Sequence, residues 1–316
     1  MQEPLFFDPV LQEKIWGGQK LNTIFGYDLP TKKIGEYWAI SAHPKGISTV
    51  KNGKYQGQKL DKLWKSHREL FDNVSGEVFP LLTKILDAQD YLSVQVHPDN
   101  AYALKHEGEL GKSECWYIID AKPNAEIIYG HHAKTRKELA QMIYNECWND
   151  LLAHLPVKKG EFYYVPSGTI HAVGKGILIL ETQQSSDTTY RVYDFNRKNN
   201  KGKLRKLHIK HSIDVINIPG TTPKFKITEK KVGLSTITTF VKTPFFNVYK
   251  WQVQKELFLQ KNAPYTLVSV IDGKGNLIIN EDSYVLKKGD HFILPAGINT
   301  WKFIGKLNLI ASEPGD

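Results

Sequence analysis

A short run of residues between Gly160 and His171 limits the possible folds of this chain more than any other part of it. Gly160 suits a turn, and residues 161–165 read Glu-Phe-Tyr-Tyr-Val, which is rich in the aromatic and branched residues of strands. Pro166 and Gly168 then mark a second turn, because proline cannot donate to a sheet and both residues favour tight turns. His171 follows at once, so we expect its side chain at a strand end, facing the mouth of a β-barrel.

The spacing of this run is glycine, five residues, proline, one residue, glycine, two residues and histidine. It resembles the second signature of the cupins, a metal-binding family of jelly-roll-like β-barrels. The resemblance implies a barrel that binds a metal through the final histidine, and it predicts further ligands on neighbouring strands.

Three more candidate ligands lie upstream of His171. Gln95 and His97 are two residues apart in an alternating segment, so both side chains face the same side of a predicted strand. Glu114 opens an apolar run and can point inward from its first position. Two imidazoles, one carboxylate and one amide oxygen suit zinc, and also iron or manganese, and leave a coordination position for substrate. We therefore predict a metal centre formed by Gln95, His97, Glu114 and His171.

The rest of the chain predicts a mainly β fold with a few helices. Short strands are expected at 79–86, 93–97, 114–119, 125–129, 161–165, 176–181 and 189–194. Their frequency, without regular strand–helix alternation, favours an antiparallel barrel or sandwich. Apolar residues recur at helical spacing in residues 60–70 and 137–155, so we expect a helix in each, and a short helix at 206–217.

The turn–strand–turn pattern recurs near the carboxyl terminus. Residues 287–297 align with residues 158–168 at an offset of 129 residues, and the match holds at both glycines and the proline. Such a repeat predicts a second barrel of the same kind. Thr300 stands where the first copy has His171, and no Gln/His strand pair precedes it. We therefore expect the second barrel to have lost its metal.

These patterns together predict two domains, which the length of 316 residues also favours. Residues 1–218 form the predicted N-terminal catalytic cupin domain, and residues 219–316 form a degenerate cupin-like domain without metal ligands. The segment 218–223, rich in proline, glycine and threonine, is the predicted linker.

Composition limits the partners and the location. The net charge is +9, but the lysines are dispersed and no RNA-binding signature is present, so we expect no nucleic-acid partner. The excess of positive charge suits an anion such as a phosphorylated metabolite. The start of the chain has no signal-peptide pattern, no run of about 18 apolar residues is present, and two cysteines do not indicate a disulfide scaffold. We predict a cytoplasmic protein without a membrane span.

Several further motifs occur in a fixed order along the whole chain: Gly35–Trp38, Ser41–Pro44, Phe79–Lys84, Val94–Pro98, Gly111–Trp116, Val165–Ala172, Glu181–Gln184 and Tyr190–Asp194. As a set they resemble the type I phosphomannose isomerases, in particular the short bacterial form. Longer members insert a large helical domain where this chain has only the segment 137–155. The resemblance implies a zinc-dependent, reversible conversion of mannose 6-phosphate to fructose 6-phosphate, with one zinc ion per chain.

The resemblance also places the functional residues of the family on this chain. Its metal ligands fall on Gln95, His97, Glu114 and His171, and its catalytic arginine falls on Arg191. Aldose–ketose isomerisation moves a proton between carbons 2 and 1 through an ene-diolate, and a divalent metal stabilises the negative charge of that intermediate. The forked, permanently cationic side chain of Arg191 can hold an oxyanion near the metal.

Three other residues are candidates for catalysis and substrate binding. Lys84 and Lys112 are expected to bind the phosphate or to polarise the sugar. Glu181 is a candidate for the base that moves the proton, in competition with a metal-bound water or a histidine. Glu36 is expected to support the barrel. The other histidines have no partner at ligand spacing and are expected at the surface or in caps: His43, His67, His106, His154, His208, His211 and His291.

Two other functions stay open on the sequence. A non-catalytic cupin could contain a metal and bind a sugar phosphate without converting it. An iron-dependent cupin dioxygenase could use the same barrel, although it needs an apolar cavity and has no use for phosphate-binding cations. In each of the sugar-phosphate interpretations the partner is a small molecule, and we expect a monomer or a weak homodimer.

Overall fold

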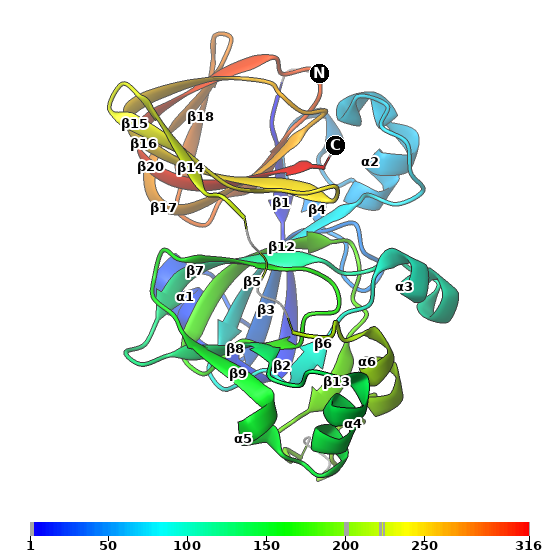
Figure 1. The fold of residues 1–316 in the computed structure, drawn as a ribbon. Coiled ribbons are helices and arrows are strands. Elements are labelled where there is room, and N and C mark those ends of the chain that lie inside the picture. Colours follow the sequence, from blue (N-terminus) through cyan, green and yellow to red (C-terminus); the bar gives the residue numbers. More distant parts are fainter. Residues whose placement is uncertain (1–2, 199–201, 221–222, 224, 316) are drawn as a thin grey trace.

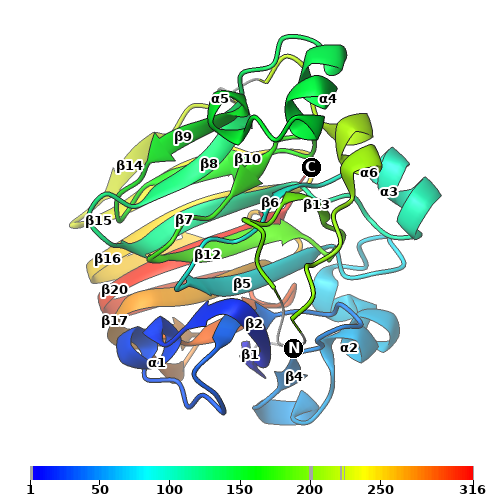
Figure 2. The ribbon, with the colours of Figure 1, turned by 90° about the horizontal axis from the view of Figure 1, so that it is seen from below.

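The computed structural model describes residues 3–198, 202–220, 223 and 225–315. Within those ranges the chain is mainly β, with twenty strands arranged in three sheets, and six α-helices and two short 3-10 helices around them (Figures 1 and 2). The predicted mainly β fold with few helices is confirmed.

The first sheet has six antiparallel strands and forms the middle layer of the molecule (Figure 1). Its strands, in sheet order, are β10 (Phe162–Val165), β7 (Glu114–Ala121), β12 (Ile177–Gln184), β5 (Leu81–Ala88), β2 (Val10–Gly18) and β3 (Ile34–Ile40). All of the residues of β3, β5 and β12 are buried, so this sheet is covered on both faces.

The second sheet has five strands and packs against one face of the first. In sheet order they are β13 (Tyr190–Tyr193), β6 (Val94–Val96), β11 (His171–Ala172), β8 (Glu126–His131) and β9 (Leu152–Pro156). One apolar cluster contains Trp16 and Trp116 of the first sheet together with Ile127 and Tyr129 of the second. The metal ligands predicted from the sequence come from these two sheets.

The third sheet contains the strands of the carboxyl-terminal part. Its path is β14 (Thr228–Val232), β15 (Ser235–Lys242), β16 (Phe246–Gln260), β20 (Thr300–Pro314), β17 (Thr266–Ile279), β19 (His291–Leu294), β1 (Leu5–Asp8) and β4 (Thr49–Val50), with β18 (Asp282–Lys287) paired to β17. The first strand of the chain therefore pairs with β19 in a sheet made mostly of late residues.

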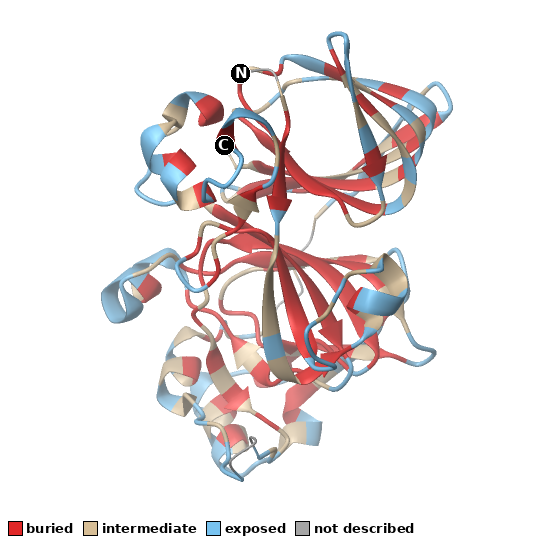
Figure 3. Cartoon of the chain, turned by 180° about the vertical axis from the view of Figure 1, so that it is seen from behind, coloured by how far each residue is buried: buried red, intermediate tan, exposed pale blue. Residues whose placement is uncertain are grey.

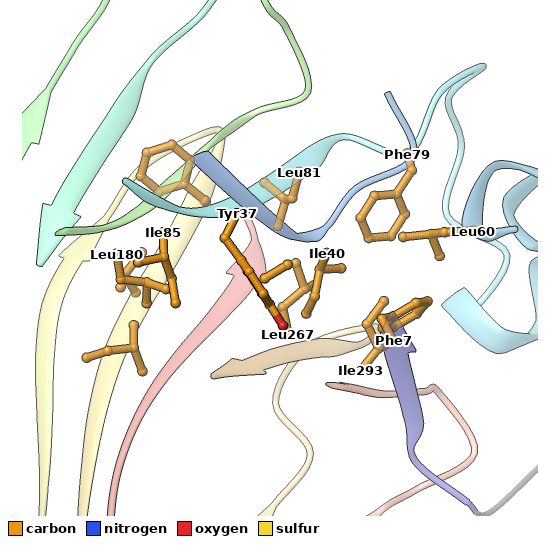
Figure 4. Close-up of a cluster of buried hydrophobic side chains, with 14 of the residues drawn as sticks. Phe7, Tyr37, Ile40, Leu60, Phe79, Leu81, Ile85, Leu180, Leu267 and Ile293 are labelled. Atoms are coloured by element: carbon orange, nitrogen blue, oxygen red, sulfur yellow. The ribbon is translucent and has the colours of Figure 1, made fainter. Parts of the chain in front are cut away.

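A large apolar cluster joins the first and third sheets (Figure 4). Tyr37 of the first sheet lies close to Leu267 of the third, and Ile85, Leu180 and Ile293 belong to the same cluster. Burial of each such side chain stabilises the fold by about 1.5–3 kcal/mol. Figure 3 shows that buried residues follow the strands, whereas the helices keep exposed faces.

The helices lie at the edges of the sheets. They are α1 (Lys20–Phe25), η1 (Gly53–Tyr55), α2 (Leu60–Ser66), η2 (Arg68–Phe71), α3 (Asn100–Glu107), α4 (Arg136–Tyr144), α5 (Trp148–Leu151) and α6 (Ile209–Val215). The helices predicted at 60–70 and 206–217 are confirmed by α2 with η2 and by α6. Among the described residues, none of the helices combines the length and the apolar character that a membrane span requires.

The prediction of one helix over 137–155 is wrong. Helix α4 ends at Tyr144, and Glu146 takes a left-handed backbone conformation with φ of 55°. The chain then forms one further turn of helix, α5, and Leu152–Pro156 pairs with β8 as strand β9. A short apolar run fits a strand as well as a helix. Pairing with β9 satisfies the backbone groups along the edge of β8, which would stay unpaired if residues 152–156 continued a helix.

The repeat predicted from the sequence has the same local structure in both copies. Gly160 and Gly289 have φ of 93° and 90°, a region that favours glycine. Each is followed after one residue by a four-residue strand, β10 in the first copy and β19 in the second. Of the predicted linker 218–223, residues 221 and 222 lie outside the described part of the chain.

Candidate metal centre

Three of the predicted ligands meet where the first two sheets face each other. His97 follows β6 directly, Glu114 is the first residue of β7, and His171 is the first residue of β11. Each has at most 1% of its surface exposed. The potential ligand atoms of the three residues all lie within 4.8 Å of one another.

The carboxylate of Glu114 lies between the two imidazoles. Its Oε2 is 3.4 Å from Nε2 of His97, and its Oε1 is 3.4 Å from Nε2 of His171. Oε2 of Glu114 also lies 2.9 Å from Nζ of Lys112. A buried carboxylate beside two imidazole nitrogens, with the potential ligand atoms within 4.8 Å of one another, is the environment that a divalent cation would complete.

Both imidazoles are oriented by their second nitrogen. Nδ1 of His97 lies 2.8 Å from the carbonyl oxygen of Thr188, and Nδ1 of His171 lies 2.9 Å from that of Thr169. Each Nδ1 must carry the hydrogen, so each Nε2 presents a lone pair to the centre. Burial lowers the pKa of His97 to about 3 and also lowers the pKa of His171, so both rings are neutral, as metal ligands must be.

Gln95 is the fourth predicted ligand. It lies in β6 directly opposite His171, and its Nε2 is 3.4 Å from Nε2 of that histidine. The amide therefore borders the centre. A rotation of the amide by 180° exchanges its nitrogen and oxygen and would present Oε1 to a cation at this position.

Lys112 places a positive charge against the same group. Its Nζ lies 2.9 Å from Oε2 of Glu114 and 3.1 Å from Nε2 of His97, and the residue is 5% exposed. Burial alone would lower the pKa of Lys112, but the carboxylates of Glu114 and Glu181 raise it overall. Burial likewise opposes the charge of Glu114, but the ammonium of Lys112 brings the pKa of Glu114 well below the usual range.

Glu181 is joined to the centre through one indole. Nε1 of Trp116 donates to Oε1 of Glu114 at 3.0 Å and to Oε2 of Glu181 at 3.1 Å. Glu181 is 3% exposed, and its burial, with the nearby charge of Glu114, raises its pKa to about 7. Its Oε1 has no hydrogen-bond partner among the described residues, so that oxygen can accept a proton.

Lys84 lies between two carboxylates on the same sheet. Its Nζ is 3.8 Å from Oε1 of Glu181, 3.8 Å from Oε2 of Glu36 and 4.5 Å from the ring centre of Trp38. Glu36 also forms an ion pair with Lys14, at 3.0 Å. Burial raises the pKa of Glu36, but the charges of Lys84 and Lys14 lower it below its usual value, so the carboxylate is ionised.

Arg191 lies in β13, paired in register with Gln95 of β6. Its Nε donates to Oγ of Ser93 at 3.3 Å and one terminal nitrogen donates to the carbonyl oxygen of Lys206 at 2.9 Å. These two bonds fix the plane of the guanidinium at the cavity wall. Burial and the nearby Arg205 lower the pKa of Arg191, which starts so high that the cation persists.

A cavity of about 250 Å³ is lined by several of these side chains, among them Gln95, Lys112 and Glu181. Five basic residues line it, against three acidic ones: Lys14, Lys84, Lys112, Arg191 and Arg205, against Glu36, Glu181 and Asp187. The lining is therefore polar and carries an excess of positive charge. Such a cavity suits a small anionic, hydroxyl-rich molecule better than an apolar one.

Comparison with known proteins gives the family. A profile described as "Phosphomannose isomerase type I, catalytic domain" matches residues 5–119, and one described as "Mannose-6-phosphate isomerase, cupin domain" matches residues 236–314. The mannose-6-phosphate isomerase of Streptococcus mutans is 58% identical over 100% of both chains. This chain belongs to the type I phosphomannose isomerase family.

Other members of the family are also similar to this chain over nearly its full length. The mannose-6-phosphate isomerase ManA of Bacillus subtilis is 51% identical, over 98% of this chain and 99% of its own. A crystal structure of the mannose 6-phosphate isomerase from B. subtilis superposes with a TM-score of 0.97 at 49% identity, over 99% of this chain and 100% of that one. The phosphomannose isomerase of Salmonella typhimurium, at 16% identity and a TM-score of 0.79, shares the fold.

Most of the predicted site residues of this phosphomannose isomerase family member lie together. Gln95, Lys84, Lys112, Glu181 and Arg191 line the cavity, and the three remaining ligands lie beside it. Sequence reasoning missed the cavity residues Lys14, Asp187 and Arg205, and it gave Glu36 only a supporting role. Lys14 lies in β2, whereas Asp187 and Arg205 lie in loops, and no local pattern in the sequence links these three residues to the cavity.

The prediction that the other histidines lie at the surface or in caps is wrong for His291 and His43. His291 is 3% exposed and His43 is 5% exposed. Nδ1 of His291 lies 2.8 Å from Oγ of Ser269, and its Nε2 lies 3.0 Å from the hydroxyl of Tyr27. Both partners come from other strands or loops, so the sequence around His291 gives no sign of them.

Proposed function

We propose that this chain catalyses the reversible isomerisation of mannose 6-phosphate to fructose 6-phosphate. The observation that carries the proposal is the buried group of His97, Glu114 and His171 beside a cavity with more basic than acidic lining residues, in a member of the type I phosphomannose isomerase family. An aldose–ketose isomerase needs both features, because it must bind an anionic sugar and stabilise negative charge on its oxygens.

The proposed cofactor is one zinc ion per chain. His97, Glu114 and His171 would hold it, with Oε1 of Gln95 as a fourth ligand, which is a mixed nitrogen and oxygen set that zinc accepts. When bound, a divalent cation supplies a Lewis acid for the oxygens of the sugar. Neutral imidazoles and an ionised carboxylate, with potential ligand atoms within 4.8 Å of one another, support this assignment.

Glu181 is the proposed base. Its carboxylate is buried, its Oε1 lacks a hydrogen-bond donor among the described residues, and its pKa of about 7 suits a group that both takes and returns a proton near neutral pH. In this role it would remove the proton from carbon 2 of the open-chain sugar and return it to carbon 1.

Three cations are proposed to bind and orient the sugar. Arg191, with its guanidinium fixed at the cavity wall, would hold a developing oxyanion. Lys84 and Lys112 are each buried and ion-paired with carboxylates, which favours polarisation of sugar oxygens over binding of the phosphate. The wider excess of positive charge in the cavity would attract the phosphate group.

We propose two cupin barrels as the scaffold for this site. The matching turns at Gly160 and Gly289 and the cupin-domain match at residues 236–314 support a repeated fold with domains at 1–218 and 219–316. Strand β1 would then reach from the first domain into the sheet of the second. The second barrel would be degenerate, since the described residues contain a single candidate metal group and it lies in the first.

The location and the assembly are also proposals. Membership of a family of metabolic enzymes supports a cytoplasmic location. The proposed state is a monomer or a weak homodimer, which sedimentation at several protein concentrations would test.

The test is an assay of mannose 6-phosphate conversion under nitrogen, combined with metal analysis of the same preparation. We expect fructose 6-phosphate to form without oxygen, and chelation to abolish its formation until zinc is restored. Turnover that requires oxygen would instead indicate an iron-dependent dioxygenase. Tight sugar-phosphate binding without any conversion by the zinc-loaded protein would indicate a non-catalytic binding protein.

A further inference from the structure

A row of four side chains crosses the cavity face of the first sheet. Trp38 of β3 is paired in register with Lys84 of β5, Lys84 with Glu181 of β12, and Glu181 with Trp116 of β7. Residues paired directly across strands point to the same face. The ammonium of Lys84 and the carboxylate of Glu181 are therefore neighbours, with an indole on either side.

Lys84 is held by charge and not by hydrogen bonds. The residue is 3% exposed, yet its Nζ makes no hydrogen bond to any residue in the described part of the chain. Its nearest anionic atoms are Oε2 of Glu36 and Oε1 of Glu181, each at 3.8 Å. Since Lys84 lines the cavity, its three N–H donors are available to a bound molecule.

Glu36 is anchored on both oxygens. Nε1 of Trp38 donates to its Oε2 at 2.6 Å, and Nζ of Lys14 lies 3.0 Å from its Oε1. The residue is 8% exposed and lines the cavity, and its hydrogen bond and ion pairs are with Trp38, Lys14 and Lys84, none of which is a candidate metal ligand. Its fixed charge can therefore influence the reaction through Lys84.

We propose that Glu36 is a positioning residue for the isomerisation. It balances the pull of Glu181 on the Lys84 ammonium and keeps that ammonium in the cavity, where it donates to a sugar oxygen. Without the charge of Glu36, Glu181 is the one carboxylate of the described residues left within 4 Å of the Lys84 ammonium, and Lys84 moves onto Oε1 of Glu181, the atom assigned to proton transfer. This inference rests on the proposed function.

The first test is Glu36→Gln, which keeps the shape of the side chain and removes its charge. We expect kcat to fall about ten- to a hundredfold, the size of effect that a misplaced catalytic group produces, with KM and zinc content unchanged. The matched control is Glu13→Gln on β2, an exposed carboxylate that does not line the cavity, and its kcat should equal that of the unaltered protein.

The second test separates positioning from mere support of the fold. If Glu36 acts through Lys84, the double variant with Lys84→Met and Glu36→Gln should lose no more kcat than Lys84→Met alone. If the fold-loss of kcat in the double variant equals the product of the fold-losses in the two single variants, the proposal is overturned. An unchanged kcat in Glu36→Gln would also overturn it. If Glu36→Gln does not fold, Trp38→Phe removes the indole N–H that anchors Glu36 and should also lower kcat, and full activity there contradicts the proposal.

These outcomes are distinct from a failure of the proposed function. If the unaltered, zinc-loaded protein does not convert mannose 6-phosphate, the isomerase assignment fails with everything that rests on it. If the unaltered protein is active and Glu36→Gln is equally active, the role of Glu36 alone is refuted.

Discussion

The two copies of the turn–strand–turn repeat share a backbone and differ in what surrounds it. In the first copy, the strand β10 leads to His171, which is buried beside Glu114 and His97. In the second, the strand β19 leads to Thr300, which is exposed. The comparison teaches that the repeat supplies the scaffold, while the candidate metal centre depends on side chains contributed by other strands.

The interiors of the two regions differ in the same way. Around β5, β7 and β12 the first region buries Lys84, Lys112, Glu114 and Glu181, each near an opposite charge. The interior of the third sheet is an apolar cluster that includes Trp251, Leu277 and Phe303. Buried ion pairs contribute little net stability, whereas apolar burial is the main stabilising term in folding. The first interior is therefore shaped by function and the second by stability.

The largest effect should come from removing a ligand in the first copy. Glu114→Gln should abolish zinc binding and lower turnover by about a thousandfold or more, because the centre loses its one anionic ligand. Metal analysis and a sugar-phosphate assay measure both losses. Thr300→Ala, at the matching position of the second copy, is the control and should change neither. Zinc-loaded, active Glu114→Gln would refute the assignment of the centre.

A smaller loss is expected for Arg191→Ala. The guanidinium is held at the cavity wall and touches none of the three central ligands, so zinc content should stay the same. We expect kcat to fall about a hundredfold, as when one electrostatic stabiliser of a transition state is removed. Turnover equal to that of the unaltered protein would remove Arg191 from the mechanism.

Trp116→Phe should have a weaker effect, and we expect it to lower the affinity for zinc. The indole N–H orients the carboxylates of Glu114 and Glu181, and loss of such an outer contact typically weakens metal binding by about ten- to a hundredfold. Competition with a chelator of known affinity measures the change. Trp251→Phe, in the apolar cluster of the third sheet, should leave zinc affinity untouched. Equal affinities in all three proteins would contradict the role of the indole.

The smallest effect concerns stability in the second region. Burial lowers the pKa of His291 to about 3, below the value of about 6.5 in an unfolded chain. Between these values the unfolded state binds more protons, so the free energy of unfolding falls as pH falls through this window. From pH 7 to pH 5 the loss assigned to His291 is about 2 kcal/mol.

Urea unfolding of the unaltered protein and of His291→Asn, at pH 7 and pH 5, isolates this contribution. His97 and His171 titrate in the same direction, but they contribute equally to both proteins. The variant should therefore depend less on pH than the unaltered chain. An identical pH dependence in the two proteins would show that His291 is not buried as a neutral ring.

Local patterns predicted the parts of the site that lie close in sequence. The turn around Gly160, the spacing of Gln95 and His97, and the repeat near Gly289 each depend on neighbouring residues, so the sequence shows them directly. The prediction of one helix over 137–155 is wrong, because residues 152–156 at its end pair with β8 as strand β9.

What the sequence could not predict depends on the register between distant strands. Glu36, Lys84 and Glu181 form a charged group only because β3, β5 and β12 pair in one register. A shift of that register by one residue would turn these side chains to the opposite face. The burial of His291 likewise depends on Ser269 and Tyr27, which no local pattern links to it.

The most direct test of the central claim is a zinc titration of the metal-free protein, followed by mannose 6-phosphate turnover under nitrogen. The account predicts that activity rises in proportion to added zinc and stops rising at one ion per chain, with no recovery in Glu114→Gln. Full turnover before any metal is added, or equal recovery in Glu114→Gln, would contradict it.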